Sequence, residues 1–339
     1  IKKIPTIISR YFLMLLFLDS IMNYTNTSNI PLPLAVFLAT DHYDYVPNVI
    51  SATSLLKPAR QLILADRLSS EDNLVELSDM VSSRMGTAIH TAIEQAWLNP
   101  TKALKSLGYS DDIIQRIKVN PETVEENDIP VYMEKRSFKK VGNHTISGKF
   151  DFVAEGKVHD FKSTSVYGYL NQSNANKYIL QGSLYRWLNP DIITKDEMLI
   201  HYIFTDWSKA ESLRNPNYPK ARVHSQKYNL LGLEEIEQFV KDKLELYDSM
   251  KHQQEKDIPY CTDEELWRKP TVWKYYKNAN ATRATKNFDN PSEAYALQQT
   301  NGTGEVREVK GTVSACKYCP AFLLCSQKDE LINSGDLIL

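Results

Sequence analysis

The stretch Gly148-Lys149-Phe150-Asp151, followed by His159-Asp160-Phe161-Lys162, decides the fold that this sequence predicts. Apolar and polar residues alternate on both sides of Glu155-Gly156-Lys157, which is typical of a β-hairpin with its turn at that tripeptide. Such a turn carries Asp151 back beside Asp160. Because successive side chains of a strand point to opposite faces, Asp160 and Lys162 should share one face while Phe161 occupies the other.

The charges of this hairpin indicate its chemistry. The carboxylates of Asp151 and Asp160 can hold a hard divalent cation, and the ammonium group of Lys162 beside them can orient or activate a water molecule. The combination predicts metal-assisted hydrolysis of a phosphodiester. An Asp-x-Lys sequence also occurs by chance in many chains, so the prediction depends on residues elsewhere.

Composition limits the classes of protein to which the chain can belong. Its 339 residues suffice for one large domain or two moderate ones, and 42% hydrophobic with 24% charged residues is typical of a soluble globular protein. The net charge of -2 means that no global field draws the chain to DNA. A nucleic-acid surface must therefore be a local patch, and basic residues do cluster within 135–140, 220–227 and 274–286.

The first residues carry an apolar run, 11–18, that is far shorter than the ~20 residues of a membrane span. Basic residues precede it, but no small-residue cleavage site follows. Because the sequence opens with Ile1 and Met22 offers another start, we expect residues 1–21 to be upstream translation or a dispensable extension. A secretory signal is the alternative. We expect no membrane association and a cytoplasmic location.

Periodicity along the chain predicts an α/β fold with a central mixed sheet of about five strands flanked by helices. The expected boundaries are an N-terminal extension (1–30), a helical region (31–128), a core (129–256) and a cysteine-rich segment packing on the core (257–339). The expected helices are 50–64, 82–98, 174–188 and 233–252, and the expected strands are 131–138, 145–154, 158–163, 198–205 and 222–230.

The helix expected over 82–98 contains Gly86-x3-His90-x3-Glu94. This spacing stacks the three residues on nearly one helical face. The glycine would let another backbone approach closely, and His90 could offer a ring nitrogen to a metal. The alternative is a histidine whose hydrogen bonds are satisfied within an ordinary helix.

The helix expected after the Asp-x-Lys strand carries Gln181-x3-Tyr185, again on one face. Beside a phosphodiester site both side chains could hydrogen-bond backbone phosphates or brace the lysine. A surface amide and a half-buried aromatic residue are the alternative reading. Glu134 and Arg136 share a face of the first strand and could add a carboxylate or a phosphate contact.

The chain has four cysteines, and three of them form Cys316-x2-Cys319-x5-Cys325 near the end of the sequence, with Cys261 upstream. Four thiols suit a tetrahedral site that binds zinc or a [4Fe–4S] cluster. Disulfides and inert buried thiols are the alternatives. One remote cysteine plus a closely spaced trio favours iron–sulfur over a zinc ribbon, which more often has two Cys-x2-Cys pairs.

Taken in order, these motifs resemble the RecB-type nucleases of the PD-(D/E)xK superfamily. The residues that carry the resemblance are Gly86-x3-His90-x3-Glu94, Gly148-x2-Asp151, Asp160-x-Lys162 and Gln181-x3-Tyr185. The cysteines are similar to those of its iron–sulfur branch, which includes the AddAB-type helicase–nucleases, the CRISPR-adaptation exonucleases and related phage-encoded nucleases. The resemblance covers roughly residues 50–330, and it implies a restriction-endonuclease-like core.

The resemblance implies a role for each matching position. His90, Asp151 and Asp160 would ligate Mg²⁺ or Mn²⁺ together with the backbone carbonyl of Phe161, and Lys162 would position or deprotonate the attacking water. Gln181 and Tyr185 would brace this site and the DNA backbone. The thiols of Cys261, Cys316, Cys319 and Cys325 would hold a structural [4Fe–4S] cluster, or structural Zn²⁺ as the alternative. In the relatives one cluster cysteine precedes the core, whereas here Cys261 follows it.

We therefore expect a metal-dependent deoxyribonuclease that acts in DNA repair, recombination or phage DNA metabolism, in the host cytoplasm if the chain is phage-encoded. An exonuclease on single strands or DNA ends is the first expectation, because the sequence has no nucleotide-binding Gly-x4-Gly-Lys-Ser/Thr motif of a helicase. A helicase or recombination partner could supply unwinding. The alternatives are an endonuclease selective for structure or sequence, and a catalytically silent DNA-binding accessory module.

Overall fold

The computed structural model describes residues 23–40, 46–68, 74–172 and 174–339. The chain forms two compact units, one from residues 1–43 with 68–84 and one from residues 44–67 with 85–339. The interpretation of residues 1–21 as an extension lies outside the described residues. Among the described residues, no helix combines the length and apolar character that a membrane span requires.

The first unit is a small α/β assembly. Strands β1 (Asn23–Thr25) and β3 (Leu74–Glu76) pair in parallel, and helix α1 (Leu32–Ala39) packs against the 3-10 turn η2 (Leu77–Met80). The Glu76 carboxylate accepts hydrogen bonds from the Thr25 hydroxyl (2.5 Å) and from the Thr27 amide (3.1 Å). These bonds lower the pKa of Glu76 to about 2 and close the loop after β1.

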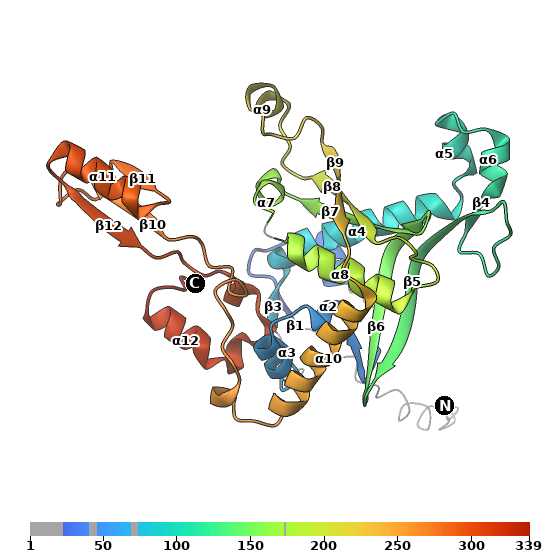
Figure 1. Ribbon diagram of the computed structural model, residues 1–339, viewed down its shortest axis with the longest axis horizontal. Coiled ribbons are helices and arrows are strands. Elements are labelled where there is room, and N and C mark those ends of the chain that lie inside the picture. Colours follow the sequence, from blue (N-terminus) through green and yellow to red (C-terminus); the bar gives the residue numbers. More distant parts are fainter. Residues whose placement is uncertain (1–22, 41–45, 69–73, 173) are drawn as a thin grey trace, which may run out of the picture. The chain divides into compact units, whose positions relative to one another are not determined.

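A mixed sheet forms the centre of the second unit (Figure 1). Its order is β4-β5-β6-β7-β8-β9, and β2 pairs with β6 outside this path. The neighbours β4/β5, β7/β8 and β2/β6 are parallel, and the others are antiparallel. The strands are β2 (Val49–Ser51), β4 (Ile117–Val119), β5 (Ile129–Val141), β6 (His144–Ala154), β7 (Lys157–Thr164), β8 (Glu197–Phe204) and β9 (Val223–Asn229).

The predicted hairpin is confirmed. Ala154 pairs with Lys157, and the two residues between them have left-handed φ angles of 51° at Glu155 and 74° at Gly156, as the tight turns of hairpins require. Gly156 cannot be replaced without rearrangement, because an added Cβ would lie 2.2 Å from the Thr194 hydroxyl. The turn fixes the register that positions Asp151 opposite Asp160.

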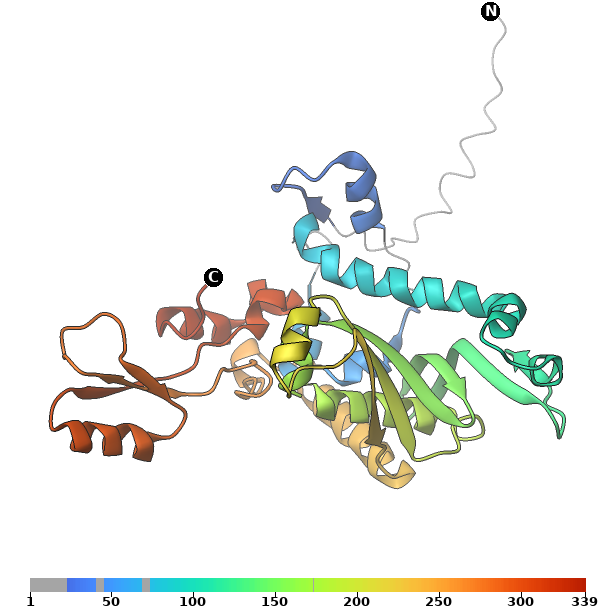
Figure 2. The same cartoon turned by 90° about the horizontal axis from the view of Figure 1, so that it is seen from above.

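Helices cover both faces of this sheet, and Figure 2 shows α4 (Val81–Leu98) on the side opposite α10 (Leu233–Met250). The main core lies between the sheet and α2 (Ala52–Leu55), α8 (Ala175–Leu188) and α10. On the α4 side, Trp97 packs on Phe152 with ring centroids 5.0 Å apart. The main core includes Phe150, Val153, Val158, Leu184, Ile200, Ile236 and Val240.

Two expectations about the elements were wrong in detail. The sheet is larger than about five strands, because β4 joins its edge and β2 pairs with β6, and segments of three residues carry too little alternation to be recognised. The helix expected over 50–64 is instead β2, α2 and α3 (Ala59–Ala65), because Pro58 has no amide hydrogen to continue a helix. The charged connection contains α5 (Thr101–Ser106) and α6 (Asp111–Arg116).

The segment after residue 258 is more regular than its sequence indicates. Strands β10 (Val272–Tyr276), β11 (Lys286–Phe288) and β12 (Glu305–Val309) form an antiparallel sheet in the order β11-β10-β12, and α11 (Pro291–Asn301) packs on it. This small α/β element lies between Cys261 and Cys316 in the chain. The remaining elements are α7 (Val166–Leu170), α9 (Lys209–Arg214), η3 (Glu255–Asp257), η4 (Ala315–Tyr318), η5 (Pro320–Leu324) and α12 (Ser326–Asn333).

Candidate metal centre

The candidate site lies where the pairing along β6 changes partners. Residues 145–147 of β6 pair with β2 and residues 152–154 pair with β7. Asp151 and Asp160 occupy opposing positions one step beyond the Phe152–His159 pair, and the Asp151 Oδ2 atom accepts a hydrogen bond from the Phe161 amide (3.3 Å). The hairpin therefore places the two acids in opposing positions, as the sequence predicts, but Asp160 lies outside the group of ligand atoms within 4.8 Å that His90, Glu134 and Asp151 form among the described residues.

The opposite edge of β6 is irregular at the same point. Glu134 faces Asp151 across the β5–β6 ladder, between the pairs Met133–Phe152 and Lys135–Phe150, and no pairing joins them. The φ angle of Glu134 is 49°, a left-handed conformation that is unfavourable for a residue with a side chain. The same irregularity shifts which residues of β6 point to each side of the sheet. Phe150 and Val153 both lie in the main core, whereas Phe152 lies in the cluster beside α4. Strain of this kind concentrates at functional sites.

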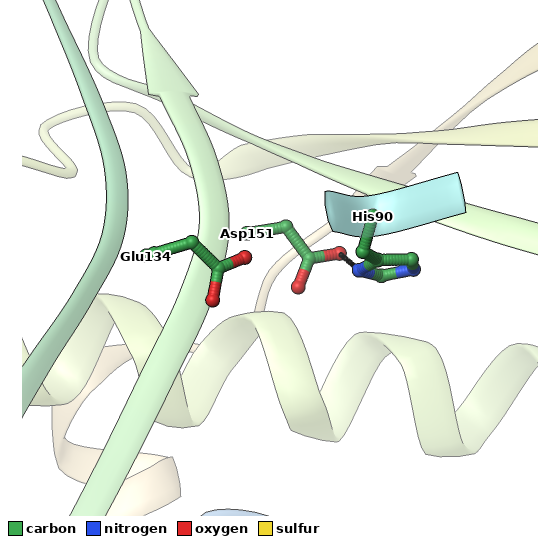
Figure 3. Close-up of side chains that lie close together, drawn as sticks. All are labelled: His90, Glu134 and Asp151. Atoms are coloured by element: carbon green, nitrogen blue, oxygen red, sulfur yellow. Dashed lines mark ion pairs between the residues drawn. The ribbon is translucent and has the colours of Figure 1, made fainter. Parts of the chain in front are cut away.

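His90 approaches the acids from α4. Its Nδ1 atom lies 3.3 Å from Asp151 Oδ2, and its Nε2 atom lies 2.8 Å from the carbonyl oxygen of Phe161. Figure 3 shows the Asp151 carboxylate between His90 and the Glu134 carboxylate. Helix α4 and strands β5 and β6 thus direct three side chains toward one point, and β7 adds a backbone oxygen.

The donor set fits a divalent cation. Ligand atoms of His90, Glu134 and Asp151 lie within 4.8 Å of one another, and within the described residues this is the one group of three or more His, Cys, Asp or Glu side chains to do so. Neighbouring ligands around Mg²⁺ lie about 3 Å apart when metal–oxygen bonds are about 2.1 Å. The 3.3 Å between His90 Nδ1 and Asp151 Oδ2 is close to that value, whereas the Phe161 carbonyl faces the other ring nitrogen of His90. Carboxylate, carbonyl and imidazole donors suit Mg²⁺ or Mn²⁺.

Glu134 is the third member of this group, although the ligand set expected from the sequence did not include it. The sequence indicated only that Glu134 could add a carboxylate, because alternation alone cannot reveal its left-handed backbone. Its carboxylate also forms an ion pair with Lys149 (2.6 Å). Arg136, considered with it, donates instead to the Ser147 hydroxyl (3.2 Å).

Asp160 and Lys162 form the second part of the site. They share a face of β7, as expected, and the Lys162 Nζ atom lies 2.6 Å from Asp160 Oδ2. Asp160 is buried (1% exposed), and while Oδ2 faces Lys162, its Oδ1 atom has no hydrogen-bond partner among the described residues. A buried carboxylate with unused lone pairs is costly in a folded protein. The unused lone pairs are those that a cation would engage.

The electrostatics of the four groups are mutually dependent. The pKa of Asp160 is raised to about 6, because burial and the charge of Asp151 together outweigh the opposing effect of Lys162. Burial opposes ionisation of Asp151 as well, but the hydrogen bond and charge of His90 prevail and its pKa is lowered. For Lys162, burial is outweighed by Asp160 and Asp151, so its pKa is raised and the ammonium form is favoured.

Helix α8 supports this centre from the other face of the sheet. Gln181 donates to the Tyr185 hydroxyl (2.8 Å), and Tyr185 is buried, which raises its pKa well above the ordinary value. An added Cβ at Gly148 would lie 2.6 Å from Leu188 and 3.2 Å from Tyr185. Gly148 of the quoted stretch therefore allows α8 to pack closely on β6, and Gln181 and Tyr185 stack as predicted.

The rest of the α4 motif has a different role from the one expected. Glu94 lines a hollow together with His90, Glu134, Asp151 and Phe161. Gly86 does not admit a backbone, because its nearest neighbour to an added Cβ is the Ser163 hydroxyl at an ordinary 3.5 Å. The expectation of a close backbone approach at Gly86 was wrong.

The four cysteines are unpaired and lie near one another. Burial raises the pKa of Cys261 to about 12, with smaller contributions from Glu265 and from the other three thiols. The disulfides considered from the sequence do not form. Cys316 and Cys261 pack with Leu266 and Leu331, whereas Cys319 and Cys325 pack with Ile63 and Ile258.

The four thiols do not form a tetrahedral group in the described chain. Thiolates bound to one Zn²⁺ at about 2.3 Å lie about 3.8 Å apart. Within the described chain, no three of the cysteine sulfurs lie within 4.8 Å of one another. A [4Fe–4S] cluster binds each cysteine through a different iron and holds the sulfurs further apart. The buried Arg60 also donates from Nε to the Cys325 sulfur (3.2 Å).

No family model matches this sequence, and no curated protein matches it. Among solved structures, the chain is similar to one whose title reads "Crystal structure of SSO0001", with 18% sequence identity and a TM-score of 0.38. The match covers 63% of this chain and 84% of that chain. At this level of similarity, the function must be inferred from the chain's own site.

Proposed function

We propose that this protein is a metal-dependent DNA nuclease of the RecB type, with a restriction-endonuclease-like core. The observation that carries the proposal is the convergence of His90, Asp151 and the Phe161 carbonyl beside the Asp160–Lys162 pair. The mixed α/β architecture supports it, because β5, β6 and β7 are antiparallel, β8 continues in parallel with β7, and α4 and α8 lie on opposite faces.

Each residue of the site has a separate role in the proposed reaction. His90, Asp151, Asp160 and the Phe161 carbonyl, with Glu134 as a further ligand, would hold a divalent cation, which would supply charge stabilisation at the phosphate and acidify water. Lys162 holds its proton, orients the attacking water and stabilises the negative charge that develops on the phosphate. Gln181 donates a hydrogen bond to the Tyr185 hydroxyl within α8, and the two side chains would brace the site from that helix.

The preferred substrate is single-stranded DNA or a DNA end, cut as an exonuclease would cut it. An endonuclease selective for structure or sequence is the second candidate, and a silent DNA-binding accessory module is the third. The intact acids and lysine disfavour the third. A helicase or recombination partner would supply single strands.

The proposal is tested by cleavage of end-labelled single-stranded DNA with Mg²⁺, Mn²⁺ or EDTA, using the wild type and Asp160→Ala. We expect cleavage with either metal, none with EDTA and none by the variant. Product lengths on linear and on covalently closed circular DNA then separate the two nuclease classes, because an exonuclease leaves the circle intact. Absence of cleavage by the wild type with both metals would contradict the proposal.

The cysteine segment is proposed to hold a structural [4Fe–4S] cluster that joins the end of the chain to the core, with zinc as the alternative. Its support is the set of four free thiols whose charges act on one another and the Arg60 contact to Cys325. Protein purified without oxygen should show a broad absorption band at roughly 400 nm that Cys319→Ala lacks. A colourless protein that contains stoichiometric zinc would instead establish the alternative.

A further inference from the structure

Lys177 lies in the first turn of α8, four residues before Gln181 and eight before Tyr185. The three side chains therefore form one row along the helix, with Lys177 at its start. The Lys177 side chain is exposed, and within the described residues it forms no hydrogen bond or ion pair. Its helix has no acidic residue in the first turn to compensate it.

Lys57 is a second uncompensated cation. It lies in the link between α2 and α3, where its carbonyl oxygen accepts a hydrogen bond from Lys243 (3.3 Å). Its own side chain is half-buried and has no partner of either kind in the described part of the chain. Lysines are seldom withdrawn from water without a counter-charge.

The charges of these lysines act on one another and on the site. Although Lys177 is exposed on one side, desolvation by the atoms around its base lowers its pKa, and the charges of Lys162 and Lys57 lower it further. The geometry agrees: the Lys162 Nζ atom lies 5.7 Å from the ring centroid of Tyr178, the neighbour of Lys177 on α8, and α2, which precedes Lys57, packs on α8. Asp160 compensates Lys162, but the charged groups that act on Lys177 are both lysines. Such a gathering is unfavourable in the free protein and is relieved by an anion.

We infer that Lys177 and Lys57 bind a backbone phosphate of the substrate strand, next to the phosphate that is cut. This inference rests on the proposed function and extends it by assigning a subsite for a neighbouring phosphodiester. The contact would be electrostatic and independent of base sequence, because each lysine presents a point charge to phosphate oxygens. It would hold the strand in position for Lys162.

The test is equilibrium binding of a fluorescent single-stranded oligothymidylate in EDTA, where no cleavage interferes. The variants are Lys177→Ala, Lys57→Ala, Lys177→Arg and a matched control, Lys195→Ala. Lys195 is exposed and lies beside the β6–β7 turn, at the other end of β7 from Lys162. The Lys195→Ala substitution changes the net charge by the same amount as Lys177→Ala but leaves the proposed subsite intact.

We expect Lys177→Ala to bind about tenfold more weakly at low salt, since a charge-assisted contact to phosphate is lost. The slope of log affinity against log salt should fall by about 0.7, the value for one contact to a single strand. Lys57→Ala should change both in the same direction, Lys177→Arg should retain most of the affinity, and Lys195→Ala should match the wild type.

The inference is overturned if Lys177→Ala and Lys195→Ala bind alike, or if the wild type does not bind the oligonucleotide. Failure of the proposed function would look different. If the protein binds the oligonucleotide through Lys177 but cleaves no DNA with Mg²⁺ or Mn²⁺, the inferred subsite stands and the proposed nuclease function fails.

Discussion

Glu134 holds a left-handed backbone conformation opposite Asp151, and such a conformation costs a non-glycine residue about 1–2 kcal/mol. The fold tolerates this cost where the carboxylate reaches the ligand atoms of His90 and Asp151. Function accounts for the strain better than folding does, because a regular β5–β6 ladder would be available without it.

The Glu134→Asn variant separates the effect of backbone strain on stability from the effect of the carboxylate on metal binding. Asparagine tolerates left-handed backbone better than most residues, so the thermal midpoint should stay within a few degrees of the wild type. Loss of the carboxylate should weaken Mn²⁺ binding by about tenfold, measured by calorimetric titration. If Glu134→Asn binds Mn²⁺ like the wild type while Asp151→Asn does not, Glu134 is not a ligand.

The residues of the candidate site were predictable to different degrees. Asp151, Asp160 and Lys162 follow from strand alternation and one turn, both of which are local properties of the sequence. The contact of His90 with the Phe161 carbonyl joins residues far apart in the chain. Local patterns cannot predict such a contact, and only the order of the motifs along the sequence suggested it. Glu134 could be suggested but not chosen, because its conformation depends on tertiary packing.

At the scale of elements, the packing of α8 on β6 depends on Gly148. Gly148→Ala places a methyl group against Leu188 and Tyr185, and overpacking of this kind costs about 1–3 kcal/mol. We expect a lower free energy of unfolding in urea and slower cleavage, because the displaced Tyr185 is the partner of Gln181.

Gly86→Ala is the matched control within α4. An added Cβ there meets only an ordinary contact, and alanine favours a helix over glycine by about 0.5–1 kcal/mol. The variant should be as stable as the wild type or more stable. Equal destabilisation by the two substitutions would contradict the assignment of Gly148 as the site of close packing.

Elements with many residues were the most predictable. The extents of β5, β6, β7, α8 and α10 agree with their sequence patterns, because alternation and helical spacing repeat several times in each. The β10–β12 sheet was missed, since its strands are short and β11 joins β10 through a polar loop. The pairing of β2 and β4 with the sheet is set by tertiary contacts alone.

At the scale of the whole second unit, Arg60 joins three distant segments. Its guanidinium donates to the Ile258 carbonyl (2.6 Å) and to the Cys325 sulfur (3.2 Å), and it forms an ion pair with Glu255. The side chain is 2% exposed. Helix α3, the residues before Cys261 and the cysteine-bearing end of the chain therefore depend on one cation.

Arg60→Lys should destabilise this unit although it keeps the charge. A lysine cannot reproduce the divergent donors of a guanidinium, and an incompletely compensated buried ion costs about 3 kcal/mol. Urea unfolding measures the loss, and faster bleaching of the absorption band near roughly 400 nm in air would accompany it if the cysteines hold a cluster. Unchanged unfolding would show that Arg60 is not essential to this junction.

The central claim is that Lys162 acts chemically beside a cation held by Asp151, Asp160 and His90. Its most direct test is the rate of single-stranded DNA cleavage by Lys162→Ala with saturating Mn²⁺, compared with the wild type and with Lys195→Ala. We predict a loss of about 10² to 10⁴-fold for Lys162→Ala, retained Mn²⁺ binding, and no loss for Lys195→Ala. Cleavage by Lys162→Ala at the wild-type rate would contradict the claim.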